Sequence, residues 1–200
     1  MSAFPYGTTE IEHLKKRDRR LGAAIDEIGM IKRAINPDLF NALVASVAGQ
    51  QISAKAAETV WSRMEGRFGV ITPDTISAAT TEEIHQCGIS LKKAGYIKGI
   101  GNAVVEGILD LDGLHELPDE EVISRLTALR GVGIWTAEML LIFAMERPDV
   151  LSFGDLAIRR GMMRLYGKES LNRAAFERYR KRYSPYGSVA SLYLWEISHR

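Results

Sequence analysis

The fold is decided by one stretch from Leu126 to Gly161, LTALRGVGIWTAEMLLIFAMERPDVLSFGDLAIRRG. Apolar residues recur three and four positions apart on both sides of Gly131-Val132-Gly133, which predicts two helices joined by a glycine turn. Pro148 stops the second helix, and Asp155 stands directly before a third apolar-periodic stretch. The stretch therefore predicts a helix, a tight turn, a helix, a loop and a third helix with an aspartate at its start.

The glycine turn has two interpretations. Two glycines around one apolar residue allow left-handed backbone dihedrals, and they leave the amides of the turn and of the next helix open to an anion. A DNA phosphate is the natural candidate for that anion. The alternative is a plain helix connector whose glycines only allow close packing.

The composition excludes several kinds of site. The single cysteine, Cys87, rules out an intramolecular disulfide, a four-cysteine iron–sulfur cluster and a cysteine zinc site. The four histidines are scattered without the spacing of metal ligands. No run of about 18 apolar residues exists that could span a membrane, and the N-terminus lacks the apolar segment of a secretory signal. A length of 200 residues and a hydrophobic fraction of 46% allow one domain or two small lobes with a real core.

The charge of the chain is nearly balanced but uneven. A formal net charge of +1 does not by itself indicate a nucleic-acid-binding protein. Basic residues nevertheless cluster, and a local basic face is compatible with a neutral total. Ordinary solvated helix faces would explain the same pattern. The clusters are Lys15–Arg17, Lys92–Lys93, Arg159–Arg160 and Arg178–Arg182.

The rest of the chain predicts an all-α protein with roughly ten helices. No stretch alternates with the period of two that is typical of a strand. Asn36-Pro37 should start a helix with proline in its first turn, and Ser53 should cap the next one. The final helix is apolar almost all round and should be buried. The expected helical stretches are about 10–33, 37–48, 54–68, short turns within 72–89, 92–109, the hairpin helices from Pro118, 156–166, a helix around 176–183, and 188–198.

Five stretches, in the same order, resemble the helix-hairpin-helix DNA glycosylases. Leu126–Glu138 resembles the hairpin of that family, and Asp155 resembles its catalytic aspartate. Val47–Ser53, VAGQQIS, looks like the segment that abuts flipped DNA. Ser90–Ala94 and Tyr183–Ser188 resemble the alkylation-repair branch, 3-methyladenine-DNA glycosylase II. The resemblance spans about residues 17–197.

The resemblance implies a fold of two helical lobes that flank a DNA-binding cleft. We expect one lobe at about 37–130, and the other to combine about 1–36 with 131–200. Members of this branch often carry an N-terminal β-domain. This chain begins too close to the first glycosylase helix to hold one, so it is similar to the short, all-helical form.

Asp155 is the expected catalytic residue. A glycosylase must extract a base from the duplex and cleave its bond to the sugar. By sequence alone, Asp155 is an ordinary N-cap, and the helix N-terminus would stabilise its negative charge. An ionised carboxylate suits the positive charge that develops on a departing sugar. The two roles do not exclude each other.

Three residues are expected in the base pocket on the strength of the resemblance. Trp135 stands where the bifunctional branches carry an attacking lysine, so the resemblance implies a monofunctional enzyme in which water attacks. An aromatic ring can also stack on a cationic alkylated base. Tyr186 matches a second aromatic position, whereas Met139 stands where branch members can have another aromatic. Core packing would explain the same aromatic residues.

The DNA contacts are expected at two sets of residues. Gln50 or Gln51 would fill the hole left by the extruded nucleotide, with no basis for choosing between them, and Ile89 or Leu91 would form a second wedge. Structurally, both glutamines could instead cap a helix end. The amides near Gly131 and Gly133 would bind a phosphate, with Lys93 and Arg159 as further phosphate contacts. In the family, backbone carbonyls that match Thr127, Leu129 and Val132 hold a monovalent cation, Na⁺ or K⁺, when DNA is bound.

We therefore expect a monofunctional enzyme of base excision repair that acts on double-stranded DNA containing alkylated purines. It would be a monomer inside the cell, in the cytoplasm or nucleoid, or in the nucleus of a eukaryote, without an organic cofactor or membrane contact. One alternative is a non-catalytic helix-hairpin-helix DNA-binding module, which would leave Asp155 and the glutamine pair unexplained. Another is a glycosylase for deaminated or oxidised bases, against which the missing lysine and cysteines count.

Overall fold

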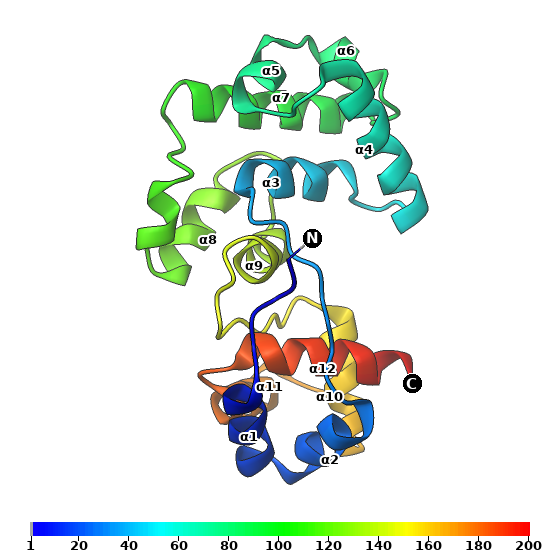
Figure 1. Cartoon of the computed structure of the whole chain (residues 1–200), viewed down its shortest axis with the longest axis vertical. Helices are drawn as coiled ribbons and strands as arrows, with labels where there is room; N and C mark the ends of the chain where they lie inside the picture. The colour runs from blue at the N-terminus through cyan, green and yellow to red at the C-terminus, as the bar shows by residue number, and fades with distance from the viewer. Residues whose placement is uncertain (1) are drawn as a thin grey trace. The chain divides into compact units, whose positions relative to one another are not determined.

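The computed structural model describes residues 2–200, and its architecture confirms the all-α prediction. These residues form twelve α-helices and one short 3-10 helix, with a single isolated bridge between Ala3 and Ala34 as their only extended pairing. Figure 1 shows the order of the helices along the chain. Within residues 2–200, no helix combines the length and the apolar character that a membrane crossing would need.

The chain divides into two compact units. The middle unit is the continuous stretch Asn36–Leu140, and the terminal unit combines the chain up to Ile35 with Leu141–Arg200. The sequence indicated a second boundary near residue 130, but in the structure this boundary follows Leu140. The reason is that the glycine turn contacts side chains of the middle unit, Gln50 and Tyr96, so the turn belongs with that unit.

The middle unit is built around α7, which packs against α3, α5 and α6. Ser53 accepts a hydrogen bond from the amide of Ala56 and caps α4 as predicted. One expected start differs: α3 begins at Leu39 behind an Asp38 cap, so Pro37 stands outside its first turn. The helices are α3 Leu39–Ala48, α4 Ala54–Phe68, α5 Pro73–Ala78, α6 Thr81–His85, α7 Leu91–Val105, the 3-10 helix Gly113–Glu116, α8 Asp119–Thr127 and α9 Ile134–Phe143, which runs past the boundary.

The terminal unit is centred on the packing of α10 against α12. A Cβ atom at Gly161 of α10 would lie 2.0 Å from the carbonyl oxygen of Leu194 in α12, so the two backbones approach as closely as glycine permits. The last helix is buried along most of its length, as predicted. The helices of this unit are α1 Thr8–Arg17, α2 Arg19–Ile28, α10 Leu156–Tyr166, α11 Arg173–Tyr183 and α12 Gly187–His199.

The single helix expected over residues 10–33 is wrong, because the chain breaks at Asp18. The backbone of Asp18 is extended, and its side chain caps α2 by accepting hydrogen bonds from the amides of Arg20 and Leu21, both at 3.0 Å. A carboxylate in this position satisfies two of the amides that a helix start leaves without partners. The apolar periodicity continues through Asp18, so the sequence pattern gave no sign of the break.

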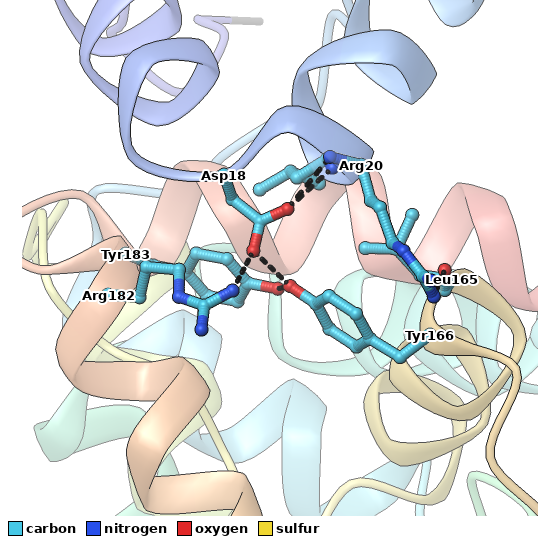
Figure 2. A network of polar contacts seen from close by, with 7 residues as sticks. Asp18, Arg20, Leu165, Tyr166, Arg182 and Tyr183 are labelled. Carbon is cyan, nitrogen blue, oxygen red and sulfur yellow. Dashed lines mark hydrogen bonds and ion pairs between the residues drawn. The ribbon is translucent and has the colours of Figure 1, made fainter.

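The Asp18 carboxylate is also the centre of a buried polar network (Figure 2). Its Oδ2 accepts hydrogen bonds from the Tyr166 hydroxyl at 2.6 Å and from Nη1 of Arg182 at 2.7 Å. The Tyr166 hydroxyl also shares a hydrogen bond with the hydroxyl of Tyr183. The network therefore joins the start of α2 to the C-terminal ends of α10 and α11.

The network changes the acidity of its members in opposite directions. Burial alone would raise the pKa of the Asp18 carboxyl, but the hydrogen bonds from Tyr166, the amide of Leu21 and Arg182 outweigh it and hold the pKa below its usual value. Burial first, and then the nearby tyrosine and carboxylate, raise the pKa of the Tyr166 hydroxyl. Asp18 is thus ionised and Tyr166 protonated at neutral pH, as the hydrogen bond between them requires.

The first prediction is that Asp18→Asn destabilises the protein at neutral pH by about 2 kcal/mol, because the charged acceptor of four donors is lost while asparagine still caps α2. A carboxyl with a lowered pKa in the folded state stabilises the fold above its unfolded pKa of about 4, and this contribution is lost as the pH falls through the folded value. Urea unfolding of both proteins from pH 7 to pH 2 should therefore show a difference that shrinks in acid. The matched control is Asp26→Asn, in an exposed pair with Lys15, which should cost little. A difference that stays constant into acid would show that the charge of Asp18 is not its source.

Candidate nucleic-acid interface and base site

The glycine turn is held against the ring of Tyr96 in α7. Gly131 has a φ of +89°, and a Cβ atom there would lie 2.3 Å from Cδ2 of Tyr96, so only glycine fits. Val132 is buried. Gly133 is exposed, with open space around its Cα, and does not adopt a positive φ. The left-handed conformation that the sequence indicated thus applies to Gly131 alone.

The glutamine segment after α3 is fixed by hydrogen bonds with two other parts of the middle unit. The Lys93 ammonium donates hydrogen bonds to the carbonyl oxygens of Ala48, at 3.1 Å, and of Gln50. Nε2 of Gln50 donates to the carbonyl oxygen of Gly131 at 2.8 Å. α7, the end of α3 and the glycine turn are therefore tied together by polar contacts.

The two glutamines differ in conformation although they are adjacent and identical. The side-chain amide of Gln50 is bonded to the glycine turn, whereas Gln51 is exposed and has a φ of +58°. A left-handed backbone at a residue other than glycine costs about 1 kcal/mol or more. Such a residue is held in place by its surroundings, and the bonds of Lys93 and Gln50 on its N-terminal side supply that constraint.

A pocket of about 660 Å³ lies within the middle unit beside these residues. It brings together five of the residues singled out by the sequence, and Trp135 is 47% exposed. None of the described residues that line it has an ionisable side chain, so the pocket offers an aromatic face, a thioether, hydroxyls and amides. The lining residues are Ala45, Ser46, Gly49, Gln50, Gln51, Ile52, Gly133, Trp135, Thr136 and Met139.

The two candidates for a second wedge are separated by burial. Ile89 is 3% exposed and belongs to the core, whereas Leu91, at the start of α7, is 54% exposed. A core side chain cannot insert into DNA, so the wedge expected for Ile89 is corrected. For Leu91 this role stays a prediction, as does the phosphate contact for Lys93.

Asp155 occupies the predicted N-cap of α10 in the terminal unit. Its Oδ1 accepts hydrogen bonds from the amides of Ala157 at 2.8 Å and Ile158 at 2.9 Å, and the residue is only 7% exposed. The helix N-terminus places partial positive charge at this carboxyl group. Hydrogen bonds from two backbone amides therefore fix the position of the Asp155 side chain.

Tyr186 also lies in the terminal unit, directly before α12. It is half-buried and meets the ring of His13 edge-on, with 5.1 Å between ring centroids. Asp149 fixes this loop, because its Oδ1 accepts the amide N–H of Gly187 at 2.9 Å and its Oδ2 accepts the hydroxyl of Ser184. Asp149 was not predicted as a site residue, since nothing in the local sequence pattern pairs it with a loop 35 residues away.

The contact of Tyr96 with the glycine turn was not predicted either. Its position three residues after Lys93 was the available signal, because residues at that spacing share one face of a helix. Lys93 contacts the glutamine segment and Tyr96 contacts the glycine turn, so one face of α7 supports both.

Comparison with known proteins gives a consistent result. The curated protein "DNA-3-methyladenine glycosylase 1" of Schizosaccharomyces pombe is 33% identical over 166 residues, which cover 80% of this chain and 72% of that protein. A "DNA-3-methyladenine glycosidase" structure from Bacillus halodurans superposes with a TM-score of 0.88 at 35% identity and covers 99% of this chain and 93% of that one. The S. pombe "3-methyladenine DNA glycosylase (Mag1) in complex with abasic-DNA" gives a TM-score of 0.83 at 29% identity, covering 96% and 98% of the two chains.

The family assignment agrees with these relatives. Residues 44–185 match the family described as "HhH-GPD superfamily base excision DNA repair protein". That range includes the glutamine segment, the glycine turn and Asp155. The resemblance seen in the sequence is confirmed: this chain belongs to the HhH-GPD superfamily of base excision DNA repair proteins.

Proposed function

We propose that this chain is a monofunctional DNA glycosylase that excises cationic alkylated purines, of the 3-methyladenine and 7-methylguanine type, from double-stranded DNA. The observation that carries the substrate class is the pocket of the middle unit, which offers the face of Trp135 but no ionisable side chain among its described lining residues. A neutral purine needs a proton to become a good leaving group. A purine that already carries a positive charge does not, and an aromatic face attracts it.

The proposed reaction is hydrolysis of the N-glycosidic bond. The bond between C1′ of the sugar and the purine nitrogen breaks, and its electron pair neutralises the departing base. Water adds to C1′ and loses a proton to solvent, which leaves an abasic site. Asp155 supplies negative charge to the cationic sugar as the bond breaks, while Trp135 has no nucleophile with which to attack it. No cut of the strand by lyase chemistry is expected.

We also propose that the hairpin binds a DNA phosphate and a monovalent cation through its backbone. Thr127 is the last residue of α8, where helix carbonyls lack intrahelical partners and carry partial negative charge. The carbonyl of Leu129 accepts the amide N–H of Val132 at 3.2 Å, which folds the turn tightly. Carbonyls of Thr127, Leu129 and Val132 are oxygen ligands of the kind that suits Na⁺ or K⁺. The amides near Gly131 and Gly133 would face the phosphate.

Gln51, rather than Gln50, is the residue that we propose to fill the vacated position in the duplex. The support is that Gln50 already uses its amide on Gly131, whereas Gln51 is exposed and held in a left-handed conformation. Lys93 and Gln50 then act as positioning residues for Gln51.

The central prediction concerns Asp155→Asn. The substitution keeps the shape and the helix cap but removes the charge, so excision of 7-methylguanine should fall by about 10²- to 10³-fold or more, with DNA binding retained. Single-turnover excision from methylated duplex and equilibrium binding to abasic duplex are the measurements. Substantial excision by the variant would remove Asp155 as the catalyst. Binding without base release by the wild-type protein, on any lesion, would favour a DNA-binding module instead.

A second prediction tests the substrate class. Trp135→Leu should lower kcat/KM for 7-methylguanine by about 2- to 30-fold more than for hypoxanthine, because only the cationic base loses a cation–π contact. The wild-type protein should act on 3-methyladenine and 7-methylguanine far faster than on hypoxanthine, oxidised guanine or uracil. Equal losses on both lesions would show that Trp135 serves only packing. Preference for a neutral base in the lesion panel would overturn the proposed substrate class.

A third prediction separates the two glutamines. Gln51→Ala should leave the free energy of unfolding within about 0.5 kcal/mol of wild type and lower excision about tenfold or more, because the vacated stack is no longer filled. Gln51→Leu is the matched control and should retain most activity, since an apolar side chain also fills the hole. Gln50→Ala should instead lower stability by about 1 kcal/mol, because Gly131 loses its hydrogen-bond donor. Loss of excision in Gln50→Ala with normal excision in Gln51→Ala would reverse the assignment.

A further inference from the structure

The terminal unit holds a second pocket, of about 360 Å³, on the helix that Asp155 caps. Four of its lining residues stand on α10 at spacings of three and four, so they share one face of the helix. The remaining three come from the segment that follows α10. The lining residues are Leu156, Arg159, Arg160, Met163, Glu169, Ser170 and Leu171.

The pocket carries unbalanced positive charge. In the part of the chain that the structure describes, neither Arg159 nor Arg160 forms an ion pair with a carboxylate. Glu169 is the one acidic residue in the lining, and it is exposed. Arg182 of the same unit differs from these two arginines, because its Nη1 forms an ion pair with Oδ2 of Asp18 at 2.7 Å.

Arg159 has a hydrogen-bond donor that the protein itself does not satisfy. Its Nε is buried and has no acceptor, while its guanidinium lies 5.0 Å from the centroid of the Phe153 ring. A buried donor of a charged group without a partner is costly, so native structures rarely keep one. An acceptor brought by a ligand would remove that cost after a small shift of the side chain.

A third arginine, Arg173, lies at the same ring, and its charge is partly offset by Glu177, whose Oε1 lies 3.7 Å from Nε of Arg173. The Arg173 guanidinium also lies 5.0 Å from the Phe153 ring centroid, so two cations share one aromatic side chain. Each is attracted by the ring, but the two repel each other. An anion close to Arg159 would offset that repulsion.

We infer that this pocket binds a phosphodiester of the DNA strand that carries the damaged nucleotide. The inference rests on the proposed function, because it takes the sugar of that nucleotide to face Asp155. Arg159 follows Asp155 by about one helical turn, or roughly 6 Å along α10. Phosphates of one strand recur every 3.4 Å or so along the duplex axis, so a phosphate within about two nucleotides of the sugar comes within reach. The exposed Leu156 and the side chain of Met163 provide an apolar surface for the adjoining deoxyribose.

The test is binding of an abasic duplex whose phosphates are replaced, one at a time, by neutral methylphosphonates. With the wild-type protein, replacement at one or two neighbouring positions close to the abasic site should weaken binding about tenfold. The Arg159→Ala/Arg160→Ala variant should bind the unmodified duplex about tenfold more weakly and be insensitive to those same replacements. Its plot of log K against log salt should lose about one unit of slope.

The matched control is Arg178→Ala/Lys181→Ala, which removes the same charge from exposed positions of α11 in the same unit. It should keep the wild-type pattern of methylphosphonate sensitivity. The single variant Arg160→Ala is less prone to misfold than the double variant, because Arg160 is exposed and the stacking of Arg159 on Phe153 is kept. Unchanged affinity and slope in both pocket variants would overturn the inference. The inference would also be overturned if the variants bound every methylphosphonate duplex more weakly by the same factor. The arginines would then act through their general electrostatic field and not by binding one phosphate.

Failure of this inference can be told apart from failure of the proposed function. Excision by the Arg178→Ala/Lys181→Ala control, measured at saturating enzyme in a single turnover, should stay close to wild type because neither Asp155 nor a lining residue of the pocket is changed. If the wild-type protein binds DNA with the expected pattern but releases no base, the pocket stands and the glycosylase assignment falls. If excision is normal but removing the arginines does not change the methylphosphonate pattern, the glycosylase assignment stands and the phosphate-pocket inference falls.

Discussion

The close approach of α10 and α12 at Gly161 is the contact on which the terminal unit depends. A Cβ atom would meet the carbonyl of Leu194 at 2.0 Å, so the two helices can lie at this distance only with glycine here. α10 is fixed at its C-terminal end as well, where Tyr166 donates to the buried carboxylate of Asp18. Its N-terminal half carries both Asp155 and the arginines of the phosphate pocket. A helix that is immobile at its middle and end keeps a carboxylate and a cationic cluster at a constant separation, as charge stabilisation of a reacting sugar requires.

The middle unit uses a different device, in which long side chains satisfy the carbonyls at helix ends. Lys93 donates to the carbonyl of Ala48, the last residue of α3, and to that of Gln50 just beyond it. Lys98 donates to the carbonyls of Ser77, at 3.0 Å, and Ala79, at 2.6 Å, at the end of α5. Cations at helix C-termini also meet the negative end of the helix dipole. Both lysines lie in the basic helix α7, so part of the positive charge of that helix also supports the architecture. Basic residues without such internal partners, such as Arg160, are the better guide to where DNA lies.

Local chemistry explains how far the sequence could be interpreted. The N-caps at Ser53 and Asp155 were predictable because a cap acts within three residues of itself. The break at Asp18 was not predicted, although its cap is equally local, because the apolar periodicity of one helix continues unchanged into the next. Ile89 and Leu91 are both apolar beside a helix start, and only tertiary packing buries one of them. Gln50 and Gln51 are the same residue, and what distinguishes them is a backbone dihedral fixed by contacts with α7 and the glycine turn.

The pocket beside Trp135 places a limit on how specificity can arise. Stacking of a cation on an aromatic face is worth about 0.5–2 kcal/mol, which cannot by itself separate a rare lesion from the great excess of normal bases. A pocket without an ionisable lining residue cannot add a proton to a normal purine either. A normal base that entered it would be held almost as well as a damaged one, but its bond to the sugar would break slowly. Under the proposed function, discrimination then lies in the rate of bond cleavage rather than in affinity, so the charge on the lesion would decide, more than the shape of the pocket, which base is removed.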